Sequence, residues 1–76
     1  MIIEVRGHTD SQGSEDYNQY LSRQRAQEVV NFLNNNGIAQ ERTQCNGFGS
    51  TLPIASNKDE LGRQLNRRVE ILIIQK

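Results

Sequence analysis

Alternating apolar and polar residues open the chain, and this pattern predicts a β-strand over residues 2–8. The residues expected on its apolar face are Ile3, Val5 and Gly7, and those on the opposite face are Glu4, Arg6 and His8. Residues 7–13 are rich in turn-forming types, so we expect a loop after this strand.

A helical period follows the loop. Ser14 precedes two acidic residues, which is typical of an N-cap and of the first turn of a helix. The pattern continues to about Asn35, and Gly37 with Ile38 behind it fits a glycine C-cap closed by an apolar contact. We therefore expect one long amphipathic helix.

The second half of the chain predicts two further strands and a short helix. The strands cover residues 43–48 and 67–75, and the second is apolar enough to be central in a sheet. Asn57 or Asp59 can cap the short helix, which would end near Gln64, and Asn57 and Glu60 have the spacing of a capping box. The residues expected to hold the intervening loop against the core are Leu52, Ile54 and Ala55.

This order of elements predicts an α/β fold. A β-α-β unit over residues 2–48 would be followed by a short helix and a final strand, with a mixed sheet and helices packed on one face. The chain shows no internal repeat and no domain boundary, so residues 1–76 form one domain. Binding residues of such a unit gather at the carboxyl ends of its strands, where Asp10 is expected.

One charge falls on the apolar side of the long helix. At 100° per residue, the residues that share one arc are Leu21, Arg25, Val29 and Phe32, and the residues that complete the same inner half of the helix are Ser22, Ala26 and Leu33. An inward guanidinium must be paired and hydrogen-bonded, and the nearest candidate partner of Arg25 is Asp10. Two interpretations follow: a structural ion pair, or a site for a ligand that carries both a positive and a negative group.

Composition excludes some functions. Nine basic and nine acidic residues balance to zero, which argues against nucleic-acid or anionic-membrane binding through bulk charge, even with Arg63, Arg67 and Arg68 close together. There is no run of 18 apolar residues and no signal peptide, so the chain is either cytoplasmic or a piece of a longer exported protein. Cys45 is the one cysteine; it has no disulfide or metal partner, and we expect it to be a small buried residue.

An enzyme can be assembled on paper from His8, Asp10 and Ser11 or Ser14, but no scaffold that would orient a nucleophile accompanies them. His8 and Asp10 are also only two potential metal ligands without a third. The sequence therefore favours a binding protein that is not an enzyme and that uses no metal or cofactor. His8 is expected to hold the loop by hydrogen bonds.

A longer set of residues, taken in order, resembles the OmpA-like peptidoglycan-binding domain of outer-membrane porins, peptidoglycan-associated lipoproteins and flagellar stator proteins. The residues that carry the resemblance are Gly7-His8-Thr9-Asp10, Gly13, Tyr17-Asn18, Leu21-Ser22, Arg25-Ala26, Val29, Phe32-Leu33, Gly37, Gly47-Phe48-Gly49, Pro53-Ile54-Ala55, Gly62-Arg63 and Asn66-Arg67-Arg68-Val69-Glu70.

The resemblance implies non-covalent binding of cell-wall peptidoglycan through the diaminopimelate residue of its stem peptide. It implies that Asp10 holds the ammonium group of that residue and that Arg25 holds its carboxylate. The other positions that it implies in the pocket are Thr9, Asn18, Leu21 and either Arg67 or Arg68. It also implies a location on the periplasmic side of the outer membrane, with membrane attachment only through a parent protein.

The family has a further strand and helix before this region. The resemblance therefore implies a domain, residues 1–76, that is truncated at its N-terminus. Such a domain would expose a sheet edge through which copies could associate. Its affinity for peptidoglycan would be reduced, and a fragment that folds without binding, or that serves as a protein-interaction module, is the alternative.

Overall fold

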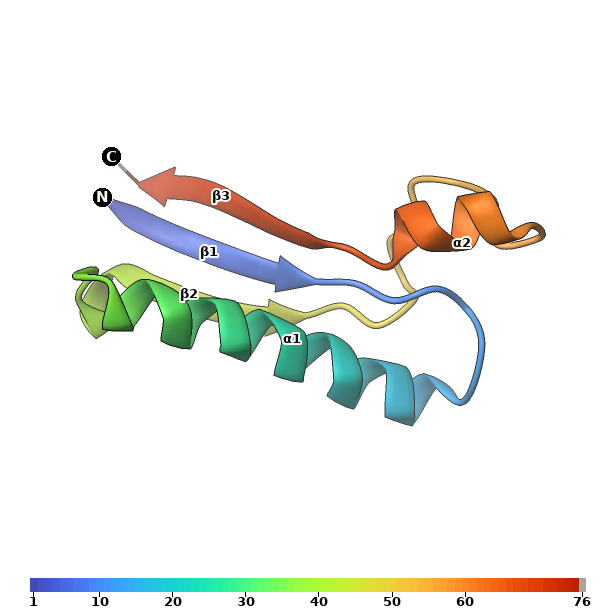
Figure 1. Ribbon diagram of the computed structural model, residues 1–76, viewed down its shortest axis with the longest axis horizontal. Coiled ribbons are helices and arrows are strands. Elements are labelled where there is room, and N and C mark those ends of the chain that lie inside the picture. The colour runs from blue at the N-terminus through green and yellow to red at the C-terminus, as the bar shows by residue number, and fades with distance from the viewer. Residues whose placement is uncertain (76) are drawn as a thin grey trace.

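The computed structural model describes residues 1–75 of the chain and shows an α/β fold, as predicted (Figure 1). The elements in chain order are β1 (Ile2–Gly7), α1 (Glu15–Asn35), a 3-10 turn (Gln40–Arg42), β2 (Thr43–Gly47), α2 (Glu60–Asn66) and β3 (Val69–Gln75). No helix within these residues is long and apolar enough to cross a membrane.

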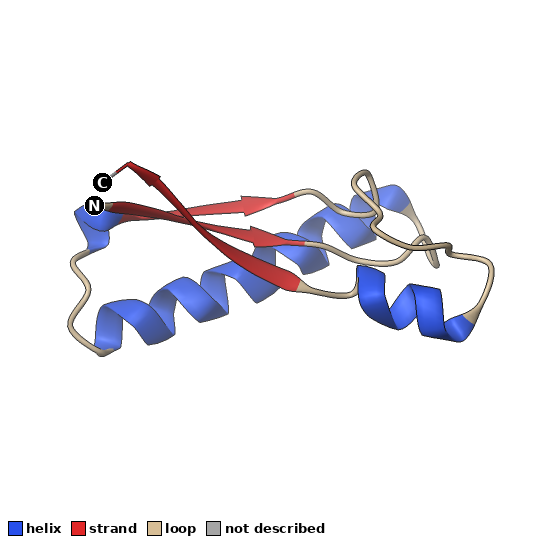
Figure 2. Ribbon diagram, turned by 90° about the horizontal axis from the view of Figure 1, so that it is seen from above, coloured by secondary structure: helices blue, strands red, loops and turns tan. Residues whose placement is uncertain are grey.

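The three strands form one mixed sheet in the order β2-β1-β3. β1 pairs with β2 in parallel and with β3 antiparallel, so the predicted β-α-β unit and the mixed sheet are confirmed. The expectation that the last strand is central is wrong, because β1 takes that place. α1 covers β1 and β2 on one face of the sheet and leaves β3 uncovered (Figure 2), so Ile71 and Ile73 of β3 stay 58% and 57% exposed.

Both predicted ends of the long helix are confirmed. The Ser14 side chain accepts a hydrogen bond from the N–H of Tyr17. At the other end, the N–H of Ile38 donates to the carbonyl of Leu33, while Gly37 adopts a φ of 101°. This bond pattern and the left-handed glycine form a Schellman motif.

The buried face of α1 differs from the predicted arc. Its fully buried residues are Asn18, Ser22, Ala26 and Val30. Phe32, which was expected on this face, is 65% exposed, and Arg25 is half-buried at the edge of the face. The predicted inner positions of Ser22 and Ala26 are confirmed, and Val29 and Leu33 pack against the core. The exposed Phe32 shows that the buried face is rotated by part of a turn from the predicted apolar arc.

Small residues explain this rotation. A Cβ on Gly7 would collide with the backbone carbonyl of Ser22, and a Cβ on Gly47 would collide with the backbone N of Arg23. The helix therefore touches β1 and β2 through backbone at Ser22, a contact that larger side chains would prevent. The apolar core is formed around this contact by Ile3, Val5, Ala26 and Val30. Cys45 is partly buried against that core, as expected, and its burial raises the pKa of its thiol.

The other face of the sheet carries a polar cluster. The Oε1 and Oε2 atoms of Glu4 accept hydrogen bonds from Arg6 and Asn46 at 2.6 and 2.5 Å. His8 is fully buried and stacks on Phe48 with 5.5 Å between ring centroids. The face opposite the apolar one is thus closed by side chains that bind across the strands.

The loop before α2 is held by hydrogen bonds rather than by the predicted apolar contacts. Leu52 and Ile54 are exposed. Asn66 instead bonds the backbone of Ile54 and Ala55 through both ends of its side-chain amide. One buried amide can satisfy several backbone groups of the loop at once.

α2 itself ends later than predicted, at Asn66 rather than near Gln64. Asp59 is its N-cap and accepts a hydrogen bond from the N–H of Gly62. Asn57 does not cap the helix; its side-chain oxygen binds Asn66. α2 lies beyond the ends of the strands (Figures 1 and 2), so the prediction that both helices cover one face of the sheet holds only for α1.

Candidate functional site

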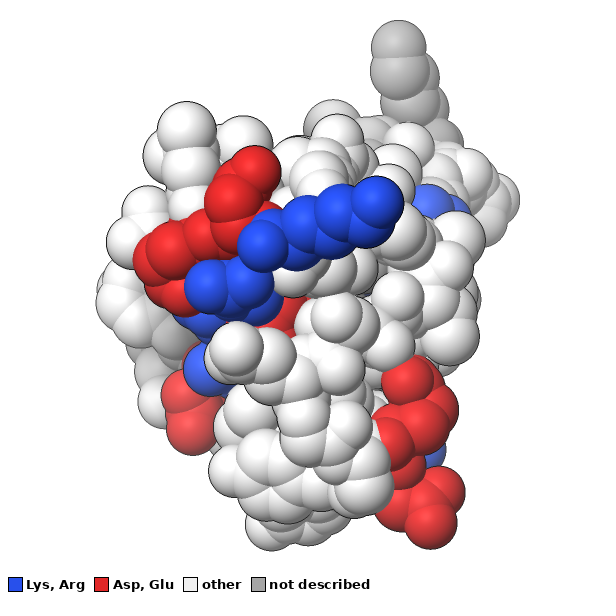
Figure 3. Space-filling model, turned by 90° about the vertical axis from the view of Figure 1, so that its right-hand side faces the viewer, with Lys and Arg blue, Asp and Glu red and all other residues white. Residues whose placement is uncertain are grey.

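Charged side chains gather at the end of the molecule where β1 and β2 finish and β3 begins. Figure 3 shows this end, with lysine and arginine beside aspartate and glutamate over α2 and the neighbouring loops. Three segments meet there: the loop after β1, the middle of α1, and the junction between α2 and β3. The β-α-β topology brings these segments together as expected from the carboxyl ends of parallel strands.

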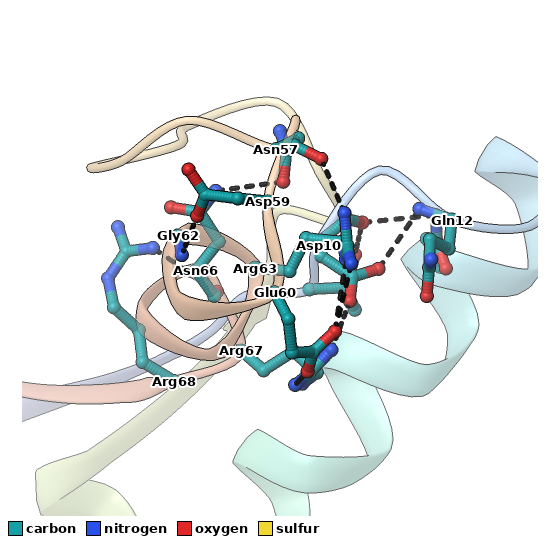
Figure 4. A network of polar contacts seen from close by, with 12 residues as sticks. Asp10, Gln12, Asn57, Asp59, Glu60, Gly62, Arg63, Asn66, Arg67 and Arg68 are labelled. Carbon is teal, nitrogen blue, oxygen red and sulfur yellow. Dashed lines mark hydrogen bonds and ion pairs between the residues drawn. The ribbon is translucent and has the colours of Figure 1, made fainter.

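Asp10 is the most buried carboxylate of this group, with 6% of the residue exposed. Its Oδ1 accepts the N–H of Gln12 at 3.0 Å, and its Oδ2 accepts from Nη1 of Arg67 at 2.5 Å (Figure 4). Burial raises the pKa of Asp10, but the bonds from Gln12 and Arg67 outweigh it and hold that pKa below its ordinary value. The internal partner of Asp10 is therefore Arg67, and the structural ion pair with Arg25, one of the two interpretations of the sequence, is absent among the described residues.

Thr9 and Asn18 fix the backbone at Asp10. The Thr9 hydroxyl donates to the carbonyl of Asp10 at 2.8 Å, and the Asn18 side-chain amide donates to the same carbonyl at 3.4 Å. The backbone N–H of Thr9 donates to the carbonyl of Gly49 at 2.9 Å, which ties the loop after β1 to the loop after β2. Both side chains are buried, so their role in this structure is to hold the carboxylate in place.

Arg67 lies between two carboxylates. Its Nη2 contacts Oε1 of Glu60 at 2.5 Å, while its Nη1 contacts Asp10. The other oxygen of Glu60 contacts the guanidinium of Arg63 at 3.1 Å. Hydrogen bonds from Arg67 and Arg63 hold the pKa of Glu60 below its ordinary value, and those to Glu60 and Asp10 raise the pKa of Arg67. Figure 4 shows this chain of alternating charges converging on the loop after β1.

Arg68 is bound differently from its neighbour. Its Nη2 donates to the carbonyl of Leu52 at 3.0 Å, and its Nε lies 3.4 Å from a carboxylate oxygen of Glu70. Its guanidinium thus holds the loop before α2 against the start of β3. Of the two adjacent arginines, only Arg67 contacts Asp10.

Arg25 differs from these arginines because the described residues offer it no ion pair and no hydrogen bond. It lines a hollow of about 260 Å³ whose other walls are Arg67, Arg68 and Val69. Leu21 is half-buried one turn earlier on the same side of α1. The hollow therefore contains the unpaired guanidinium of Arg25 together with Arg67, the partner of Asp10. This arrangement suits a ligand that carries a carboxylate.

A second hollow of about 240 Å³ lies on the outer side of α1. Its lining residues are Tyr20, Arg23, Gln24 and Gln27. All four come from one helix, and no buried charged residue among residues 1–75 is part of the lining. The hollow lined by Arg25 and by Arg67, the partner of Asp10, is therefore the better candidate for a binding site.

The alternatives built on His8 receive no geometric support. Nε2 of His8 lies 2.7 Å from Oε1 of Glu70, so hydrogen bonding holds this first residue of the loop after β1 to β3, as expected. Its backbone N–H donates to the carbonyl of Arg68. Among residues 1–75, no three histidine, cysteine, aspartate or glutamate side chains are grouped as a metal would require.

Glu60 is the residue of this cluster that the sequence interpretation missed. It was read only as part of a possible capping box. Glu60, Arg63 and Arg67 stand at positions i, i+3 and i+7, which places them on one side of a helix, and this spacing is the signal that could have identified them.

Comparison with known proteins supports one family. The family model described as "OmpA family" matches residues 1–67. The chain is 48% identical over 68 residues to outer membrane porin F of Pseudomonas fluorescens, covering 90% of this chain and 21% of that protein. It is 45% identical over 71 residues to the peptidoglycan-binding protein ArfA of Mycobacterium tuberculosis, covering 93% and 22%. The chain thus spans about a fifth of the length of these two curated relatives.

A solved structure gives the same result. The crystal structure of the peptidoglycan-associated lipoprotein from Burkholderia pseudomallei superposes with a TM-score of 0.90 at 30% sequence identity, covering 93% of this chain and 60% of that one. Fold, residue order and family model agree, and they agree over nearly the whole chain. This chain belongs to the OmpA family.

Proposed function

We propose that this domain binds bacterial peptidoglycan without catalysis and anchors an envelope protein to the cell wall. The observation that carries the proposal is the half-buried guanidinium of Arg25, which has no partner among residues 1–75 and faces the hollow beside Asp10. Two relatives are named as a peptidoglycan-binding protein and a peptidoglycan-associated lipoprotein, which supports the same ligand and a location in the envelope.

The ligand group that fits is the diaminopimelate residue of the stem peptide. Its side chain ends in a carbon that carries both an ammonium and a carboxylate group. The carboxylate would bind Arg25 through charge-assisted hydrogen bonds, and the ammonium would bind Asp10. A stem peptide with lysine at this position has the ammonium group but no carboxylate, so it would leave Arg25 unpaired.

The other proposed site residues support these two. Thr9 and Asn18 hold Asp10 by its backbone carbonyl, Leu21 forms an apolar wall next to Arg25, and Arg67 and Arg68 line the hollow. All seven side chains come from the loop after β1, from α1 and from the junction between α2 and β3. The site therefore depends on the packing of α1 against the sheet.

A titration of isotope-labelled protein with a diaminopimelate-containing stem peptide tests the proposal. Saturable chemical-shift changes are expected at Asp10, Asn18 and Arg25, and they are expected to vanish in Asp10→Asn and Arg25→Gln. Arg23→Gln, an exposed arginine on the same helix, serves as the matched control and should bind normally. A folded wild-type protein that shows no saturable changes would refute the proposal.

We also propose that copies of the chain associate through β3. The N–H of His8 bonds the carbonyl of Arg68, and antiparallel pairs alternate, so the free N–H and C=O groups of the outer edge belong to Val69, Ile71 and Ile73. The one charge on this strand, Glu70, is already held by His8 and Arg68. A neutral edge with exposed isoleucines is complementary to an identical edge.

Sedimentation analysis distinguishes this association from a monomer. The wild type should show a concentration-dependent dimer that Ile71→Lys abolishes, because a lysine on the edge opposes strand pairing. Gln44→Lys on β2, the other edge strand, is the matched control and should leave the dimer intact. A wild type that stays monomeric at millimolar concentration would rule the association out.

A further inference from the structure

Asp10 is not free to receive a ligand in this structure. One of its oxygens is bound by the N–H of Gln12 and the other by Arg67, and its side chain is 8% exposed. A ligand ammonium group needs an accessible carboxylate oxygen, and of the two donors on Asp10 the Arg67 guanidinium belongs to a side chain that can move, whereas the Gln12 N–H belongs to the backbone. Arg67 must therefore release Asp10 before an ammonium group can bind there.

Glu60 is arranged to keep Arg67 after that release. Oε1 of Glu60 already contacts Nη2 of Arg67 at 2.5 Å, whereas Asp10 contacts Nη1, so the first contact can persist when the second breaks. Glu60 is itself held, because its second oxygen contacts Arg63. Arg63 in turn donates to the backbone carbonyl of Asn57 at 3.1 Å, which connects the ion pairs to the loop before α2.

The released side of Arg67 would face the ligand. Arg67 lines the same hollow as Arg25, and a guanidinium offers donors on several sides. If Glu60 keeps one side of Arg67, the other side is free to donate to the ligand carboxylate that Arg25 also binds. The ammonium group then replaces a cation at Asp10, so the total charge at that carboxylate does not change.

From this geometry we infer that Glu60 is a positioning residue: it retains Arg67 when the ligand ammonium takes its place on Asp10, and it thereby adds a second guanidinium to the carboxylate site. The inference rests on the proposed peptidoglycan function. It assigns α2, which touches little of the sheet, a direct role in ligand affinity.

A double-mutant cycle with the diaminopimelate stem peptide tests this role by calorimetry. Glu60→Gln keeps the shape of the side chain but removes its charge, and we expect it to weaken binding by about three- to tenfold, in line with a partly exposed ion pair. In an Arg67→Gln background the same change should have no further effect. Glu60→Asp, which keeps the charge, should recover part of the affinity, and Glu28→Gln, an exposed acid on α1, should bind like the wild type.

The outcomes separate the two proposals. If Glu60→Gln binds as tightly as the wild type, or if it loses equal affinity with and without Arg67, the inference about Glu60 is wrong while the peptidoglycan site stands. If the wild type itself does not bind, both are wrong. Glu60 is 56% exposed, so its variants are expected to fold, and thermal unfolding of each variant checks this.

Discussion

Asn66 provides the most quantitative test of how α2 and its loop are held in place. Its side chain has no exposed surface and makes four hydrogen bonds. Its Oδ1 accepts from the N–H groups of Ile54 and Ala55 at 2.8 and 3.0 Å. Its Nδ2 donates to the carbonyl of Ala55 at 3.0 Å and to the side-chain oxygen of Asn57 at 2.8 Å. Asn66→Ala removes all four bonds at once.

The magnitude follows from these bonds. A neutral hydrogen bond contributes about 0.5–1.5 kcal/mol, so four of them correspond to about 2–6 kcal/mol. Water can reach part of the loop after truncation and recover some bonds, so we expect a loss of about 3 kcal/mol, in the lower half of this range. A domain of this length has a free energy of unfolding of about 4–11 kcal/mol. The variant should therefore still fold, but with a much smaller free energy of unfolding.

Unfolding in urea and thermal unfolding, both followed by circular dichroism, measure this loss. The melting temperature should fall by more than about 10 °C, since about 1 kcal/mol shifts a domain of this size by about 4–8 °C. Asn31→Ala removes one exposed hydrogen bond on α1 and is the matched control, with an expected change within about 0.5 kcal/mol. A loss below about 1 kcal/mol for Asn66→Ala would refute the reasoning, because water would then replace the buried amide without penalty.

Two further predictions concern acid stability and helix packing. The pKa values of Asp10, Glu60 and Glu70 are lowered in the folded state, so their stabilising contribution is complete above the ordinary carboxyl range and is lost as pH falls through the lowered values. The urea midpoint should therefore drop between about pH 5 and pH 2, and a flat profile would contradict these ion pairs. Gly7→Ala forces a Cβ into the backbone of Ser22, and it should destabilise the fold by about 1–3 kcal/mol or more, measured by thermal unfolding; an unchanged melting temperature would show that α1 does not approach β1 this closely.

The elements could be predicted from sequence because their signals are local. Ser14 and Gly37 mark the ends of α1 through bonds within a few residues, and both were identified correctly. The rotation of α1 could not be predicted in this way. It depends on the close approach of Ser22 to two glycines on different strands, and the helical period placed Ser22 on the inner half without indicating that the closest contact lies there.

The charged cluster was likewise predicted only in part from the sequence. Asp10 and Arg25 were identified as inward charges and lie near one hollow, but they are not each other's partner. The partner of Asp10 is Arg67, 57 residues later in the chain, and Glu60 joins it from a short helix whose position depends on Asn66. Pairing over such distances is decided by tertiary packing, so periodicity indicated which charges point inward without indicating which ones meet.

The most direct test of the central claim compares two stem peptides that differ only at the side-chain carboxylate of diaminopimelate, one with the free acid and one with the carboxamide. If Arg25 receives this carboxylate, the wild type should bind the free acid at least tenfold more tightly by calorimetry, and Arg25→Gln should bind both peptides with similar weak affinity. Equal affinity of the wild type for the two peptides would contradict the account, because the free guanidinium in the hollow would then not bind the ligand.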